Sequence, residues 1–168
     1  RPIKLLPTVE SPLANKTHDE IDFVVIRENT EDFYIGAAGR AKNGRNKHNI
    51  EINKSAFKVK FGLDVDTKGS EIAYQIGVLS KKGCERIIKY AFEYAKRKNR
   101  KKITAIDKAN MVTSYNFWRE SIDRIAKEYP GIEYEFNLID GTVMNLIRQP
   151  ERYEIIVAPN MLGDILGN

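Results

Sequence analysis

Five residues with chemically useful side chains come shortly after predicted strands of this chain. They are Arg27 and Tyr34 after "FVVI", Lys108 after "KITAI", Asp140 after "YEFNLI", and Asp164 after "YEIIVAP". In α/β proteins, ligands are bound at the carboxyl ends of strands. Two carboxylates are suitable oxygen ligands for a hard divalent cation such as Mg²⁺ or Mn²⁺. An arginine can bind a substrate carboxylate in bidentate fashion, and a lysine with a tyrosine can form an acid–base pair.

Each of these residues also has a simpler structural explanation. Lys108 suits an exposed surface position, Asp140 the N-cap of a helix, and Asp164 the first turn of a helix. Residues 27–32, with an arginine and three carboxylates, would equally suit a solvated turn after a strand. The shared position at strand ends is what favours a binding site over unrelated surface residues.

Strands and helices alternate in the second half of the chain, and this alternation predicts the fold class. The predicted strands cover residues 21–26, 102–106, 133–139 and 154–158, and the predicted helices cover residues 80–98, 114–129 and 142–148. Ser80 is expected to be the N-cap of the first helix. The order favours an α/β fold, with a layered sheet, parallel strand pairs and flanking helices.

The segment before the first predicted helix has a different character. Residues 36–49 are glycine-rich, basic and polar, so an exposed loop is expected there. Residues 55–63 alternate apolar and polar side chains, which predicts a half-buried strand, and residues 71–79 form another β-rich run. We expect a β arm that protrudes from the domain at about residues 36–63.

Composition narrows the class of protein. The 168 residues are 42% hydrophobic and 30% charged, which suits one globular domain with a real core. No apolar run approaches the ~20 residues needed to cross a bilayer, and the single cysteine, Cys84, cannot form an internal disulfide. A cytoplasmic protein without a membrane partner is therefore expected.

The net charge of +5, concentrated in "KRKNRKK" at residues 96–102, raises the alternative of a nucleic-acid partner. No aromatic residues are interleaved with this run, and no known nucleic-acid module accompanies it. Cations at the C-terminal end of a predicted helix are a sufficient explanation. We expect no nucleic-acid binding.

Three motifs, taken together, resemble one enzyme family. "VVIRENTEDFYIG", "IDKANMV" and "APNMLGDIL" are similar, in this order, to motifs of the β-decarboxylating dehydrogenases that act on 3-isopropylmalate, isocitrate, homoisocitrate and tartrate. The resemblance runs along the whole chain. It implies that residues 1–168 are the central substrate-binding, metal-binding and dimerisation domain of a longer enzyme. Most of the NAD(P) site would lie in another domain, so the chain alone is expected to be inactive.

The resemblance implies a role for each strand-end residue that contacts substrate. Arg1 and Arg27 would bind the carboxylates of a malate-type substrate. Tyr34 would help protonate the enol after CO₂ leaves, and Lys108 would help deprotonate the substrate hydroxyl. The residues that bind the dinucleotide stay unassigned.

The resemblance further implies a metal site that two subunits share. Asp164 would bind Mg²⁺ or Mn²⁺ in its own subunit, whereas Asp140 and Lys108 would reach the site of the neighbouring subunit. The expected partner is therefore a second copy of the chain. One feature departs from the family pattern "GDxLSD", because Gly167 and Asn168 occupy the last two of these positions and the second aspartate is absent.

The two longer predicted helices are expected to form the contact in this homodimer. Their aromatic residues Phe92, Phe117 and Trp118 give more apolar surface than one small sheet needs to cover. The alternative is that all of this surface is buried within the monomer. The arm is implied to contact its counterpart across the same two-fold axis.

The motifs favour one substrate over its relatives by a small margin. "RENTED" suits both isocitrate and isopropylmalate enzymes, whereas "DKAN" is closer to those acting on isopropylmalate and tartrate. We expect 3-isopropylmalate, the substrate of a leucine-biosynthesis step, with NAD as the cofactor. Isocitrate, homoisocitrate or tartrate, and NADP, are the alternatives. In a different class, the isolated chain would be a non-catalytic dimerisation module.

Overall fold

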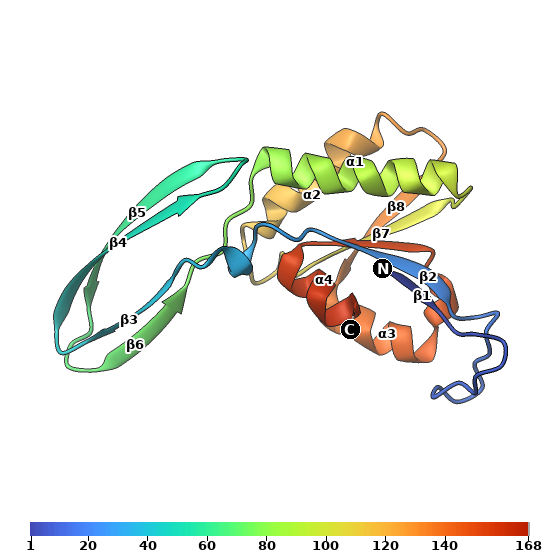
Figure 1. The fold of residues 1–168 in the computed structure, drawn as a ribbon, viewed down its shortest axis with the longest axis horizontal. Coiled ribbons are helices and arrows are strands. Elements are labelled where there is room, and N and C mark those ends of the chain that lie inside the picture. Colours follow the sequence, from blue (N-terminus) through green and yellow to red (C-terminus); the bar gives the residue numbers. More distant parts are fainter. Residues whose placement is uncertain (168) are drawn as a thin grey trace.

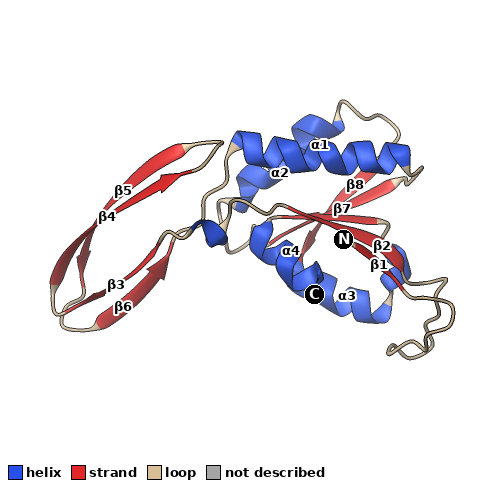
Figure 2. Ribbon diagram, in the orientation of Figure 1, coloured by secondary structure: helices blue, strands red, loops and turns tan. Residues whose placement is uncertain are grey.

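In the computed structural model, which describes residues 1–167, five strands form one sheet (Figures 1 and 2). In spatial order they are β1 (Pro2–Lys4), β2 (Asp22–Arg27), β9 (Ile155–Ala158), β7 (Lys102–Asp107) and β8 (Glu133–Leu138). The pairs β2–β9, β9–β7 and β7–β8 are parallel, and β1 pairs antiparallel with β2. The carboxyl ends of β2, β9, β7 and β8 therefore lie along one edge of the sheet.

Helices cover both faces of the sheet, so the predicted α/β layered fold is confirmed (Figure 1). The helices are α1 (Lys81–Arg97) and α2 (Tyr115–Ala126) on one face, and α3 (Ile139–Arg148) and α4 (Asn160–Gly167) on the other. Short 3₁₀ helices are η1 (Phe33–Ile35) and η2 (Pro150–Arg152). Alternate strand residues point to opposite faces, so Val24 packs in the core under α1 and α2 while Val25 packs with Leu162 of α4.

The element boundaries follow local capping and differ in places from those predicted. Ser80 is the N-cap of α1 as predicted, because its Oγ accepts a hydrogen bond from the backbone N–H of Gly83 at 3.0 Å. Helix α2 ends at Ala126 rather than near residue 129. Helix α3 begins at Ile139, earlier than predicted, directly from β8. Asp140 therefore lies in the first turn of α3 rather than in a connecting turn.

The arm, residues 38–75, is longer than predicted and contains no long loop. It consists of β3 (Ala38–Lys42), β4 (Arg45–Asn53), β5 (Lys58–Asp66) and β6 (Glu71–Gln75), which form two antiparallel pairs, β3–β6 and β4–β5 (Figure 1).

The expectation of an exposed loop at residues 36–49 was wrong. These residues are polar because a two-stranded ribbon exposes most of its side chains while its backbone groups pair across the strands. Asn43 and Gly44 both have positive φ, so the chain bends there as it passes from β3, which pairs with β6, to β4, which pairs with β5.

The aromatic residues expected at a dimer contact lie in the core instead. Phe92 and Trp118 are both 0% exposed, and Phe117 packs partly buried against the same cluster. The helices that carry them need this apolar surface to cover the sheet. Exposed apolar side chains occur on the opposite face, on α3 and α4: Val143, Met144, Ile147 and Ile165. None of the helices within residues 1–167 is long and apolar enough to cross a membrane.

Candidate functional site

A cleft of about 340 Å³ lies at the carboxyl end of β2, between α1 and α4. The side chains that border it include Arg1, Arg27, Asn29, Tyr90 and Asp164. Two arginines from neighbouring segments make the cleft suitable for a small anion. Arg1 lies beside β2, since its backbone carbonyl accepts a hydrogen bond from the Val25 N–H, and its guanidinium contacts the carbonyl oxygen of Gly167.

Arg27 is the central residue of this cleft. Its Nε and Nη2 donate hydrogen bonds to Asn160 Oδ1 at 3.0 and 2.8 Å, and its Nη1 forms an ion pair with Asp164. Helix α4 lies directly against the aliphatic part of the side chain, because a Cβ at Gly163 would be only 2.8 Å from Arg27 Cγ. The close approach of α4 brings Asp164 to the arginine.

Tyr34 completes this cluster. It lies in η1, its hydroxyl donates a hydrogen bond to Asp164 Oδ2 at 3.2 Å, and its ring centre is 5.8 Å from the Arg27 guanidinium carbon. Partial desolvation, followed by the hydrogen bond to Asp164, raises the pKa of Tyr34 above its ordinary value. The phenol thus keeps its proton at neutral pH and can act as a donor. Half of the side chain is exposed, so a ligand could reach it.

Lys108 and Asp140 form a second cluster, separate from the first. Lys108 Nζ and Asp140 Oδ2 form an ion pair at 2.9 Å, and this contact lowers the pKa of Asp140. Strands β9 and β7 lie between β2 and β8 in the sheet, so the two clusters lie at different positions along one edge. Asp140 is largely exposed, with a side-chain exposure of 65%.

A single chain does not assemble the predicted metal site. Within residues 1–167, no group of three or more His, Cys, Asp or Glu side chains could hold a metal ion. Asp164 and Asp140 each provide carboxylate oxygens of the kind that Mg²⁺ and Mn²⁺ prefer, but in separate clusters. The residues therefore fit a metal only if a second chain supplies the other carboxylate. Asn168, where the family pattern has a second aspartate, lies outside the described residues.

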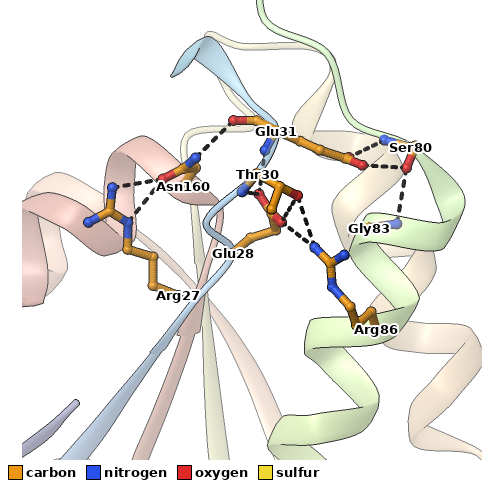
Figure 3. A network of polar contacts seen from close by, with 8 residues as sticks. All are labelled: Arg27, Glu28, Thr30, Glu31, Ser80, Gly83, Arg86 and Asn160. Atoms are coloured by element: carbon orange, nitrogen blue, oxygen red, sulfur yellow. Dashed lines mark hydrogen bonds and ion pairs between the residues drawn. The ribbon is translucent and has the colours of Figure 1, made fainter. Parts of the chain in front are cut away.

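Glu28 and Glu31 fold the loop that follows β2 (Figure 3). Glu28, only 1% exposed, accepts hydrogen bonds from the backbone N–H groups of Thr30 and Glu31, both at 2.8 Å. Arg86 of α1 donates to the same carboxylate at 2.8 Å. The loop therefore closes on the Glu28 side chain, and this closure directs the chain from Arg27 towards Tyr34.

Glu31 and Asp32 attach the same loop to three helices. The Glu31 carboxylate accepts hydrogen bonds from Ser80 N and Oγ, both at 2.6 Å, at the positive N-terminal end of α1. Asp32 accepts from the Tyr115 hydroxyl of α2 at 3.1 Å and from the Met161 N–H of α4 at 2.9 Å. Burial is the main effect on Asp32 and raises its pKa, although these hydrogen bonds act in the opposite direction.

Lys108 has a comparable support that the sequence did not reveal. Asp107, fully buried at the end of β7, accepts hydrogen bonds from Arg119 Nε at 2.6 Å and Nη2 at 2.9 Å. The same carboxylate accepts from the backbone N–H of Ala109 at 2.8 Å. The turn that carries Lys108 is thereby fixed on both sides. An acidic residue directly before the lysine was the signal available in the sequence.

Comparisons with known proteins agree on one family. A sequence profile of the isocitrate/isopropylmalate dehydrogenase family matches residues 1–168. The D-malate dehydrogenase (decarboxylating) of Escherichia coli is 35% identical over 169 residues, which cover 100% of this chain and 40% of that protein. A 3-isopropylmalate dehydrogenase of Corynebacterium glutamicum is 38% identical over 167 residues, covering 99% of this chain and 42% of that protein.

A solved structure shows the same relationship. The crystal structure of isocitrate dehydrogenase from Methylococcus capsulatus superposes with a TM-score of 0.69 at 34% identity, covering 92% of this chain and 38% of that one. The chain thus spans about two fifths of the length of the relatives that it matches.

Proposed function

This chain belongs to the isocitrate/isopropylmalate dehydrogenase family, and on that premise we propose that it is the central part of a metal-dependent NAD(P) oxidoreductase. The proposed reaction oxidises and decarboxylates a 2-hydroxy acid of the 3-substituted malate type. The observation that supports it is the cluster of Arg27, Tyr34 and Asp164 at the edge of the cleft. A cation, a phenol and a carboxylate meet there in a space that suits a small acid.

Arg27 and Arg1 would bind the carboxylates of the substrate. Arg27 would exchange its contact with Asp164 for one with the substrate, which leaves Asp164 to act with Asp140 of the partner subunit as a metal ligand. When bound, Mg²⁺ or Mn²⁺ supplies Lewis-acid stabilisation of the negative charge that develops as CO₂ leaves.

The protein side chains would move the two protons of the reaction. Lys108 of the partner subunit would accept the proton of the substrate hydroxyl while the hydride passes from the carbon to the nicotinamide of NAD(P). After the carboxylate leaves as CO₂, the Tyr34 hydroxyl would donate its proton to the carbon. Tyr34 is suited to this step because it is half exposed and its hydroxyl contacts Asp164, which borders the cleft.

The proposed sharing of sites explains why Lys108 and Asp140 lie apart from Arg27. The exposed apolar side chains on α3, Val143, Met144 and Ile147, mark the surface through which a second copy would pack. This is the same helix that carries Asp140, so the contact would bring Asp140 towards the partner's cleft. The homodimer is isologous, and both sites are completed together.

We favour 3-isopropylmalate as the substrate, with isocitrate, homoisocitrate and tartrate as alternatives. The similarity to a relative named as a D-malate dehydrogenase adds D-malate to the set that must be tested. All of these acids share the malate carboxylates that Arg27 and Arg1 would bind. They differ in the substituent at C3.

The test is an assay of the full-length protein that contains this chain. It should reduce NAD⁺ or NADP⁺ with at least one of 3-isopropylmalate, isocitrate, homoisocitrate, D-malate or tartrate, release CO₂, and lose activity when the divalent cation is chelated. A protein that oxidises none of these acids in the presence of Mn²⁺ would contradict the proposed function.

A further inference from the structure

We propose that Asn160 is a positioning residue that fixes the orientation of the Arg27 guanidinium for binding a substrate carboxylate. This rests on the proposed function, in which Arg27 binds that carboxylate. Asn160 is the first residue of α4, 133 positions away from Arg27 in the sequence, and the two side chains point towards each other (Figure 3).

The contact occupies one defined edge of the guanidinium. Asn160 Oδ1 accepts from both Nε and Nη2 of Arg27, at 3.0 and 2.8 Å. The remaining nitrogen, Nη1, is directed to Asp164 at the cleft. Because the guanidinium is planar and its donors have a fixed geometry, holding one edge determines where the other donors point. Asn160 therefore determines which N–H groups of Arg27 point towards a ligand in the cleft.

The amide of Asn160 is itself held in one orientation. Its Nδ2 donates a hydrogen bond to the backbone carbonyl of Glu31 at 3.1 Å, and the residue is only 2% exposed. A flipped amide would present its NH₂ group to the guanidinium and its oxygen to a carbonyl, and both contacts would be unfavourable. The loop after β2 thus fixes Asn160, and Asn160 fixes Arg27.

The residue type follows from these two contacts. An aspartate could accept from Arg27 but could not donate to the Glu31 carbonyl, and its charge would compete with a substrate carboxylate for the arginine. A neutral amide orients the guanidinium without adding a second negative charge beside that of Asp164. Asn160 is too deeply buried to contact the substrate, so its effect passes through Arg27.

The test compares Asn160→Ala with the wild type in the full-length protein. The substrate is whichever of 3-isopropylmalate, isocitrate or D-malate the wild type oxidises fastest. We expect KM to rise by about tenfold or more, the scale of losing a hydrogen bond to a charged group, with a smaller change in kcat. The affinity for Mn²⁺ without substrate, measured by electron paramagnetic resonance, should stay unchanged.

The Mn²⁺ measurement separates positioning from general damage to α4, because Asp164 lies on the same helix. Equal weakening of Mn²⁺ and substrate binding would show displacement of α4 and overturn the proposal, as would an unchanged KM. Ser121→Ala is the matched control, since Ser121 is fully buried and donates one hydrogen bond, to the Phe117 carbonyl, away from the cleft. It should leave KM and Mn²⁺ affinity unchanged.

Two further measurements test the proposal if the alanine variant does not fold or if no substrate is found. Asn160→Asp, which has nearly the same shape, replaces the alanine variant if that protein does not fold, and it should also raise KM. Crystal structures of the wild type and the variant show the guanidinium directly. We expect it to leave its wild-type orientation in the variant, and an unchanged Arg27 would refute the role of Asn160 even if the wild type oxidises none of the acids.

Discussion

At the scale of single residues, burial distinguishes the carboxylates that fold the site from those that can act in it. Glu28, Glu31 and Asp32 are each 1% exposed and have their oxygens occupied by backbone and side-chain donors. Asp164 and Asp140 are more accessible and are paired with the cations Arg27 and Lys108. A carboxylate whose partner can be exchanged for a ligand is available for binding, whereas one that satisfies buried backbone groups is not.

We predict that Asp164→Asn in the full-length protein removes most of the Mn²⁺-dependent turnover, because one anionic metal ligand is lost. Steady-state turnover measured against Mn²⁺ concentration checks this. Asp123→Asn is the control, since Asp123 accepts a surface hydrogen bond from Tyr134 and belongs to neither polar cluster. Unchanged metal dependence in the Asp164 variant would show that this carboxylate does not bind the cation.

Tyr34→Phe should slow the overall reaction while leaving reduction of the keto-acid intermediate comparatively intact. The change removes the hydroxyl that would protonate the carbon after decarboxylation and keeps the ring beside Arg27. Parallel assays of the full reaction and of keto-acid reduction give the comparison. An equal loss in both assays would indicate a structural tyrosine instead.

At the scale of elements, the loop after β2 connects the N-terminal ends of α1 and α4. The Glu31 carboxylate accepts a hydrogen bond from the backbone N–H of Ser80, the N-cap of α1. The Asp32 carboxylate accepts one from the backbone N–H of Met161, in the first turn of α4. Both carboxylates lie at helix N-termini, where the helix dipole and the free N–H groups stabilise negative charge. The strand that carries Arg27 and the helix that carries Asp164 are therefore held together by the residues between Arg27 and Tyr34.

Gly83→Ala should destabilise the fold by about 1–3 kcal/mol, the usual cost of overpacking. A Cβ at this position would lie 2.4 Å from the Glu31 carboxyl carbon, which two hydrogen bonds hold in place. Gly141→Ala is the control, because the added Cβ meets open space in α3 and should stabilise by about 0.5–1 kcal/mol. Urea unfolding measures the free energy of unfolding of both variants. Equal changes in this free energy would contradict the role of the Glu31 contact.

Asp32 should make the fold less stable as pH rises through its raised pKa. Burial raises this pKa above the ordinary 3.8, so the folded state retains a proton that the unfolded state has released. The stabilisation from this proton is complete below the ordinary pKa, and it is lost as the pH rises through the pKa of Asp32 in the folded state. The free energy of unfolding of Asp32→Asn should therefore rise relative to that of the wild type as the pH is increased from about 4 to about 7.

Urea unfolding across this pH range measures the difference between the two proteins. An amide oxygen in the place of Asp32 Oδ2 can still accept from both the Met161 N–H and the Tyr115 hydroxyl, which limits other changes. A difference that stays constant with pH would show that Asp32 titrates as it does in the unfolded chain.

At the scale of the whole molecule, the two faces of the sheet have different surfaces. The aromatic residues Phe92 and Trp118 of α1 and α2 are buried in the core, whereas α3 exposes Met144 and Ile147 to 49% and 59%. Apolar side chains left exposed on one helix mark a contact surface. The two separate polar clusters of one chain require such a contact if they are to form one site.

We predict that the chain forms a homodimer and that Ile147→Asp dissociates it, because a charge would be buried at the contact. Sedimentation equilibrium at micromolar concentration gives the mass. Leu6→Asp is the control, since Leu6 is similarly exposed, at 61%, but belongs to the segment between β1 and β2 rather than to α3. A monomeric wild-type chain, or an Ile147 variant that stays dimeric, would contradict this placement of the contact.

Local patterns in the sequence determined much of the domain. Apolar runs predicted β2 and β9, helical spacing predicted α1 and α2, and Ser80 was identified as a cap because side-chain capping acts over a few residues. The strands at the start of the arm were predicted as a loop, because the polar residues of a two-stranded ribbon resemble those of a loop when the partner strand is unknown.

Only the tertiary structure decided which strand-end residues meet. Arg27 and Asp164 are 137 positions apart in the sequence, and they touch because β2 pairs with β9 and α4 packs on the arginine through Gly163. The same topology separates Lys108 and Asp140 from them. Sequence patterns report short-range preferences, whereas strand order and helix packing depend on the long-range burial of apolar surface. Local patterns therefore predicted the residue types at the site, and only the family resemblance implied their division between two subunits. The contacts within each cluster, such as that of Arg27 with Asp164, follow from the tertiary structure.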